Sequence, residues 1–396
     1  MDRIKRVAVI SGAIGQYDLI NIFAKLLVEG FREIMPNDCE CDLVEYNDEL
    51  ATNDNFEHIT TYYDLIVTFN GIYVNFSNAP LRDYMINNNC LCLTFLIDHP
   101  YSHAERLKNS VNRQIVSCID RSHVEYLHRF FDDLHHCVFI PHGAIIPDIA
   151  IKSWDEKVGN VAFFGSYSAP EQSLAIIANS APETKETLIQ IVEEIWNGRF
   201  NTLESSIEYV LKSYGVSITD AQLADIIADS VYLDTYIRNE RRGLLIKELI
   251  ASGIEVNLYG NGWEDLETEF KENLIIHKPL DLQSCINEMT KYKIVLNNMP
   301  LFANGSHERL FSIPAAGSIL VTDTNPYVEE IFEEGKDYFK YSWDRIEELP
   351  KLISDILSDK MNVDSVIRSS REKVLENHLW KNRAQEILDY LEGNSI

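Results

Sequence analysis

The chain has no CxxC motif and no long hydrophobic run. Its seven cysteines are odd in number and none forms a CxxC pair, so the sequence predicts buried thiols rather than a structural zinc site. No stretch of about 18 apolar residues occurs, and we expect no transmembrane segment. The apolar run in the opening MDRIKRVAVISG is too short for a signal peptide. These features predict a cytoplasmic protein.

Basic residues are scarce. The 35 Lys and Arg residues stand against 62 Asp and Glu residues, which gives a formal net charge of −27. Such a charge repels nucleic-acid phosphates, so we expect no nucleic-acid partner. A local pocket for a small anion remains compatible with it, because salt screens charges over about 8–10 Å. The 396 residues are enough for two domains of ordinary size.

The first half of the chain alternates strand and helix patterns, which predicts a doubly wound α/β domain. Apolar runs typical of buried parallel strands cover residues 7–12, 41–46, 63–70, 91–98, 114–120 and 136–143. A helical pattern covers 19–35. The carboxyl ends of such strands line a cleft, and they carry Gly12 and Gly15, Asp98 and His99, and His142.

The second half predicts another α/β domain with a helical insertion. A charged stretch at 147–159 suits a linker, and strand patterns cover 161–166 and the run that ends at 298. The acidic segment 169–235 has amphipathic helical stripes and no strand signal. Helical patterns follow at 238–252, 345–357, 363–376 and 380–391. We therefore expect two facing Rossmann-like domains, at 1–148 and 149–378, and a terminal helix at 379–396.

Residues 297–323 carry the strongest functional signal. A strand leads into a polar turn, then a helix closed by Gly317 and a second strand, which is a βαβ unit. A turn at a helix N-terminus is suited to an anion, so it predicts a phosphate site. The arginine would neutralise a diphosphate, the histidine would donate to a phosphate or a sugar, and the glutamate would orient either. The turn consists of Asn304, Gly305, Ser306, His307, Glu308 and Arg309.

Two further turns of the second domain are candidates for the same site. Gly165 and Ser166 follow its first strand, where a missing Cβ lets the backbone approach a ligand. Arg242 on a later helix either adds positive charge or belongs to a solvated face. The other turn is either an ordinary tight turn or a place where aromatic faces meet a nucleotide base. Its candidate residues are Tyr259, Gly260, Gly262 and Trp263.

These motifs carry a resemblance to a known family. VAFFGS, RRGLLIKELIASGIEVNLYGNGW and VLNNMPLFANGSHERLFSIPAAGSILVTD resemble bacterial GT-B glycosyltransferases, in the group-1-like branch that includes spore-maturation (CgeB-like) proteins. The tail ENHLWKNRAQEILDYL is similar to the helix that crosses back onto the first domain in that fold. The resemblance implies a UDP- or GDP-sugar donor, no further cofactor and no obligatory metal. It departs at Ser312, where many relatives carry a carboxylate for the ribose, so either Glu308 replaces it or nucleotide recognition is altered.

The resemblance implies transfer of a hexose-type sugar to a hydroxyl of a glycan, a lipid-linked precursor or a protein. If the reaction inverts the anomeric centre, Asp98 or His99 would deprotonate the acceptor, although Asp98 could also cap the next helix. If it retains, His142 or His307 would matter more. Two alternatives stay open, namely a nucleotide-sugar epimerase and a non-catalytic binding or assembly protein on the same fold.

Overall fold

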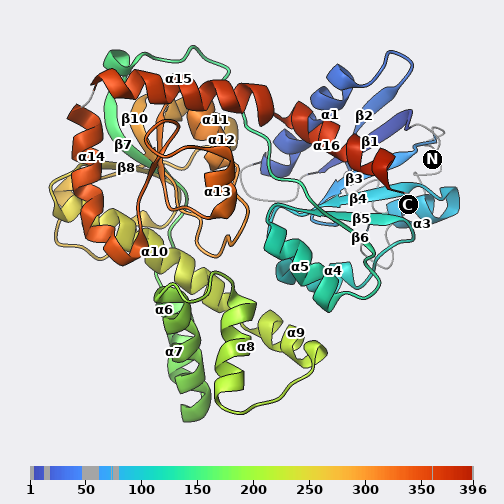
Figure 1. Cartoon of the computed structure of the whole chain (residues 1–396), viewed down its shortest axis with the longest axis horizontal. Helices are drawn as coiled ribbons and strands as arrows, with labels where there is room; N and C mark the ends of the chain where they lie inside the picture. The colour runs from blue at the N-terminus through green and yellow to red at the C-terminus, as the bar shows by residue number, and fades with distance from the viewer. Residues whose placement is uncertain are drawn as a thin grey trace. The chain divides into compact units, whose positions relative to one another are not determined.

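The computed structural model describes residues 4–12, 18–46, 62–72, 74, 80–358 and 360–394 (Figure 1). The chain divides into two compact units, Met1–Gly143 with Asn377–Ile396, and Ala144–Glu376. Each unit is built on a six-stranded sheet whose paired strands run parallel. The predicted class, two Rossmann-like α/β units, is confirmed.

The first unit has the strand order β2-β1-β3-β4-β5-β6. All residues of β3, β4 and β5 are buried, as their mainly apolar sequences predict for strands covered on both faces. The strands are β1 (Arg6–Gly12), β2 (Glu40–Tyr46), β3 (Leu65–Phe69), β4 (Leu91–Phe95), β5 (Gln114–Cys118) and β6 (His136–Phe139). The helices are α1 (Leu19–Ile34), α3 (Pro80–Asn88), α4 (Ala104–Leu107), α5 (Arg121–Phe130) and α16 (Trp380–Gly393).

The C-terminal helix α16 packs on α1, as predicted (Figure 1). The two helices approach so closely at Gly30 that a Cβ there would lie 2.8 Å from the Cα of Lys381. The indole of Trp380 packs at 4.8 Å from the ring of Phe23, and Lys381 pairs with Glu33 at 2.7 Å. The end of the chain therefore completes the core of the first unit.

The second unit has the strand order β12-β11-β10-β7-β8-β9. Its strands are β7 (Gly159–Phe164), β8 (Val256–Tyr259), β9 (Leu274–His277), β10 (Tyr292–Leu296), β11 (Ile319–Thr322) and β12 (Phe339–Lys340). The helices around this sheet are α10 (Val231–Ala251), α11 (Leu282–Met289), α12 (Arg309–Ala315), α13 (Pro326–Ile331), α14 (Leu349–Ser358) and α15 (Lys360–Asn377). The core between them is apolar and includes the fully buried Trp263.

The predicted helical insertion is present and is followed by α10. It consists of α6 (Glu171–Asn179), α7 (Pro182–Trp196), α8 (Leu203–Ser213) and α9 (Asp220–Asp229). Arg241 of α10 anchors it, because its Nη2 donates to the carbonyl of Ile195 at 3.2 Å. The same guanidinium lies over the rings of Trp196 and Trp343, at 5.9 and 5.1 Å. These contacts tie the end of α7 to the sheet-bearing part of the unit.

The segment expected to be a linker, 147–159, packs on the second unit. The amide of Asp148 donates to Oδ1 of Asn287 at 3.1 Å, and Trp154 is buried. Lys157 is buried and donates to the carbonyl of Thr290 at 2.8 Å. Burial lowers the pKa of Lys157 to about 8. No helix within the described ranges is both long and apolar enough to cross a membrane.

Candidate functional site

The strand order of the second unit creates a topological switch point between β7 and β10. From β7 the chain builds β8 and β9 on one side, then crosses to build β10, β11 and β12 on the other. In open α/β sheets, ligands bind outside the carboxyl ends of the two strands at such a point. Gly165 and Ser166 follow β7 there, and Asn297 and Asn298 follow β10.

Arg309, the first residue of α12, reaches across to the end of β7. Its Nη1 donates to the carbonyl of Phe164, and its guanidinium lies 5.6 Å from the centre of the Phe163 ring. A Cβ on Gly165 would stand only 2.8 Å from this Nη1. Gly165, which was predicted to let a ligand approach the backbone, therefore leaves room for the guanidinium of Arg309.

A second arginine lies on the same aromatic ring. Arg242 of α10 donates from Nη1 to the carbonyl of Ser166 at 2.6 Å, and its guanidinium is 6.0 Å from the Phe163 ring. Burial lowers the pKa of Arg242 well below its usual range, and the positive charge of Arg309 lowers it further. The Nε atoms of both arginines are buried and have no hydrogen-bond partner among the described residues. An anion bound here would relieve the repulsion between the two charges.

The polar turn before α12 supplies a histidine and a carboxylate beside Arg309. Nδ1 of His307 lies against the carboxylate of Glu308, and Glu308 is buried. Burial lowers the pKa of His307, although Glu308 opposes that shift. The hydroxyl of Ser306 is fully buried and has no hydrogen-bond partner in the described part of the chain. Nδ2 of Asn325 donates to the carbonyl of Gly305 at 3.0 Å and holds the turn in place. Asn304 is half-buried.

The glycine turn after β8 packs directly on the loop after β7. Gly260 has φ 143°, and a Cβ there would lie 2.5 Å from the carbonyl oxygen of Gly165. Gly262 has φ 83°, and its Cβ would lie 2.1 Å from the carbonyl oxygen of Tyr167. Both positions combine a left-handed backbone with a close approach that only glycine permits. The two turns form one unit, which orders the backbone around Ser166.

The aromatic residues of this turn are not available to stack on a base, which corrects the expectation for Tyr259 and Trp263. The ring of Tyr259 is covered on both faces, by Phe164 at 4.6 Å and by His277 at 4.3 Å, with interplanar angles of 5° and 3°. Trp263 has no exposed surface, and its indole nitrogen donates to the carbonyl of Gly165 at 2.8 Å. Both side chains instead pack and form hydrogen bonds within the second unit.

In the first unit, Asp98 lies at the carboxyl end of β4 in a polar cluster. Its Oδ2 accepts from Nδ2 of Asn70 at 3.0 Å and lies 3.6 Å from Nε2 of His103. Arg106 donates to the carbonyl of Asn70 at 2.8 Å. Asp98 is 58% exposed, whereas His103 is buried. No local pattern connects His103 with Asp98, because the histidine lies at the end of the 3-10 helix Pro100–His103.

The other candidates of the first unit lie in packing environments. His99 stacks on Tyr101 at 3.7 Å, and its Nδ1 accepts from the Tyr101 amide at 3.2 Å. His142 is buried, with its ring 5.2 Å from that of Phe23. The amide of Gly12 donates to a side chain of α1 at 2.8 Å. Gly15 lies outside the described residues.

Residues 241–389 match the glycosyl transferase-like family. Among solved structures, sucrose-phosphate synthase from Thermosynechococcus elongatus is similar over 98% of each chain, at 12% identity and a TM-score of 0.56. Anabaena Alr3699/HepE in complex with UDP-glucose is similar over 98% of this chain and all of the other, at 11% identity and a TM-score of 0.56. An alpha-glucosyltransferase in complex with UDP and a 13-mer DNA matches at 10% identity over 98% and 99% of the chains, also at 0.56. No curated protein matches significantly.

The chain has the GT-B fold of glycosyltransferases. In this GT-B chain, Ser312 is the residue at which the resemblance implied a departure from the expected carboxylate. Its side chain is fully buried, and its Oγ accepts from the amide of Ile145 at 3.1 Å. Ser312 thus belongs to the packing of the second unit and is not exposed to a ligand.

One polar residue of the GT-B switch point was not singled out from the sequence. Asn298 follows central strand β10, is 2% exposed, and neither of its amide atoms has a hydrogen-bond partner within the described residues. A buried unsatisfied amide is rare and marks a place where a water or ligand completes the bonding. In the sequence, the position is marked by the two asparagines, Asn297 and Asn298, that follow the apolar run of β10. Within the described ranges, no group of three or more His, Cys, Asp or Glu could hold a metal ion.

Proposed function

We propose that this protein is a glycosyltransferase that moves a sugar from a nucleoside-diphosphate sugar to an acceptor hydroxyl. The observation that carries the proposal is the pair of guanidiniums of Arg242 and Arg309, each with a buried Nε, on one phenylalanine ring at the topological switch point. Two like charges with unsatisfied Nε atoms call for a multivalent anion, and a diphosphate supplies one. The match of residues 241–389 to a glycosyl transferase-like family supports the same assignment.

The mechanism follows from where negative charge develops. As the glycosidic bond to the diphosphate breaks, charge accumulates on the leaving phosphate. Arg309 and Arg242 stabilise that charge from positions already fixed by the carbonyls of Phe164 and Ser166. Donors held in advance need no reorganisation during the reaction, and the arginines take the role that a metal ion would otherwise have.

The first unit would supply the acceptor side of the reaction. If the reaction inverts the anomeric centre, Asp98 is the base of choice, because it is exposed while His99 is engaged in stacking. Asn70 holds its carboxylate in place by a hydrogen bond, and His103 lies 3.6 Å from the same oxygen. If the reaction retains configuration, the imidazole of His307, which lies beside Glu308 and Arg309, becomes the more important donor, whereas His142 is packed among aromatic rings.

The donor assignment is tested by ligand-induced stabilisation. Uridine, guanosine, adenosine and thymidine diphosphates and their sugars are screened for a rise in unfolding temperature. A nucleotide at about 100 times its Kd stabilises the fold by roughly 2.7 kcal/mol. We expect one base to stabilise the wild type and to fail on Arg309→Ala. The exposed Arg199→Ala of the insertion is the control and should respond as the wild type does. If no diphosphate binds the wild type, the proposal is wrong.

A non-catalytic binding protein on the same fold is the second candidate, and Ser312 favours it. The hydroxyl of Ser312 is occupied by the Ile145 amide, so a carboxylate for the ribose is missing from that position. Glu308 is the nearest replacement, and it is paired with His307. Release of nucleoside diphosphate from the bound sugar donor separates the candidates, because only an enzyme produces it. An epimerase would instead convert the donor into a second nucleotide sugar without any acceptor.

A further inference from the structure

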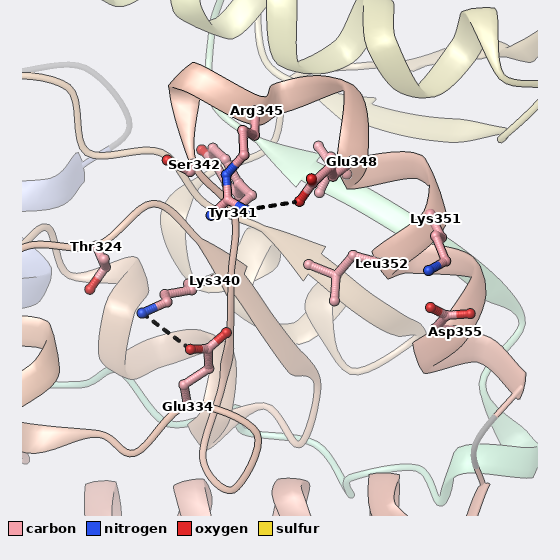
Figure 2. A pocket seen from close by; sticks show the side chains of 11 residues that line it. Thr324, Glu334, Lys340, Tyr341, Ser342, Arg345, Glu348, Lys351, Leu352 and Asp355 are labelled. Carbon is pink, nitrogen blue, oxygen red and sulfur yellow. Dashed lines mark ion pairs between the residues drawn. The ribbon is translucent and has the colours of Figure 1, made fainter. Parts of the chain in front are cut away.

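A second polar site lies on the same sheet edge, two strands from the arginine pair. A cavity of about 640 Å³ opens beside edge strand β12, and we call it the β12 groove (Figure 2). Its volume falls in the range of ligand pockets, roughly 300–1,000 Å³. In Figure 2, Thr324, Glu334 and Lys340 lie on one side, and Leu352, Lys351 and Asp355 of α14 lie on the other.

The groove is highly charged but has no net charge. Three basic residues and three acidic residues line it, in a chain whose formal net charge is −27. Lys340 pairs with Glu334 at 3.2 Å, and Arg345 pairs with Glu348 at 3.6 Å, as the dashed lines in Figure 2 mark. An anionic ligand that engaged Lys340 or Arg345 would have to break one of these pairs and face the carboxylate that it released, and one that engaged Lys351 would still meet the acidic residues of the lining. A cationic ligand would meet the converse penalty, so the lining selects against charged ligands.

The remaining lining suits a ligand rich in hydroxyl groups. Thr324 and Ser342 contribute hydroxyls, and the paired carboxylates and cations present acceptors and donors side by side. Leu349 and Leu352 add apolar surface between them, which matches the C–H faces of a sugar ring.

The position of the groove connects it with the proposed transfer. Thr324 follows β11 and Ser342 follows β12, so both lie at the carboxyl edge of the sheet, where Asn298 follows β10. Two strand spacings separate β10 from β12, or about 10 Å. We propose that the β12 groove binds a neutral oligosaccharide, as a subsite for the acceptor chain; this inference rests on the proposed function.

The proposal is tested by binding of defined neutral oligosaccharides to the full-length protein. Maltoheptaose, cellohexaose, a mannohexaose and N-acetylchitohexaose are titrated by calorimetry and by saturation-transfer NMR, with a heparin hexasaccharide as the anionic probe. We expect at least one neutral chain to bind and the heparin probe not to bind. Lys340→Ala and Arg345→Ala each remove a charged donor, and each should weaken binding roughly tenfold or more.

Lys336→Ala is the matched control. Lys336 forms an exposed ion pair with Glu333 at 2.7 Å but does not line the groove, so its loss should leave oligosaccharide binding unchanged. All three variants should bind the nucleotide as the wild type does, which shows that the donor site and the fold are intact. A wild type that binds nucleotide but none of the four neutral chains overturns the groove assignment alone. So does equal binding by wild type and both groove variants, or preference for heparin. Failure of nucleotide binding would instead refute the proposed function.

Discussion

Replacing Gly165 by alanine tests whether Arg309 is held in place for an anion. The added methyl carbon would lie 2.8 Å from Nη1 of Arg309 and 3.0 Å from the Phe163 ring, whereas carbon atoms normally approach to about 3.5–4.0 Å. The guanidinium has to retreat by roughly 1 Å, and its bond to the Phe164 carbonyl is then lost. Such overpacking costs about 1–3 kcal/mol of folding free energy.

The effect on the ligand should exceed the effect on the fold. Hydrogen bonds to charged groups contribute about 1.5–3 kcal/mol, so Gly165→Ala should weaken the Kd for the nucleoside diphosphate by about 10- to 150-fold. Calorimetric titration gives the Kd, and urea unfolding gives the stability. Gly393→Ala is the control, because a Cβ there meets nothing within 4 Å.

A double-mutant cycle completes this test. Arg309→Ala already lacks the guanidinium, so adding Gly165→Ala should weaken binding little further. The reasoning is refuted if folded Gly165→Ala binds nucleotide with wild-type affinity. It is equally refuted if the two effects add in full, because the methyl would then act on the ligand by another route.

Four further outcomes are expected. Tyr259→Phe should lower the free energy of unfolding by about 1 kcal/mol in urea and leave nucleotide affinity unchanged, because its hydroxyl bonds within the unit and its ring is covered; a large loss of affinity would contradict this. Asp98→Asn should lower kcat by about 10²–10⁴-fold if the reaction inverts, and His103→Gln should shift the pH profile of kcat, both measured by diphosphate release; an unchanged kcat for Asp98→Asn argues for retention or no role. Burial lowers the pKa of His123 well below its unfolded value, so the unfolded state binds the extra proton as pH falls below about 6.5. Wild type should therefore lose about 1.4 kcal/mol more stability between pH 7.5 and 5.5 than His123→Phe, whereas His128→Phe, on the exposed face of the same helix, should behave as wild type.

Most strands could be predicted because burial on both faces of the sheet restricts their sequences to mainly apolar residues. A parallel strand between two helical layers is buried on both faces, and runs such as residues 65–69 and 91–95 contain little else but apolar residues. Strand β12 was missed since it has two residues, too few for any pattern. The helix expected over 345–357 is instead a 3-10 segment at Trp343–Glu348 followed by α14, because Arg345 has non-helical dihedral angles.

The site was predictable in its backbone and less so in its side chains. Glycines that follow strands signal a close approach, and Gly165, Gly260 and Gly262 all show one. The sequence does not say what approaches, and here it is a guanidinium and two carbonyl oxygens. The local pattern leaves open whether Tyr259 and Trp263 face a base or pack in an ordinary turn, and their bonds to residues 33 and 98 positions away favour packing. Long-range contacts of this kind leave no mark in a local pattern.

Because Ser312 accepts the hydrogen bond from the amide of Ile145, the lack of an acid at this position does not by itself mark this chain as inactive. Installing glutamate at this position would force a carboxylate into a fully buried site and would leave the Ile145 amide without its acceptor. Motif restoration is therefore expected to damage the protein rather than to improve it. A motif search that demands an acid here would discard a chain whose arginine pair is intact, because the position has been recruited for packing.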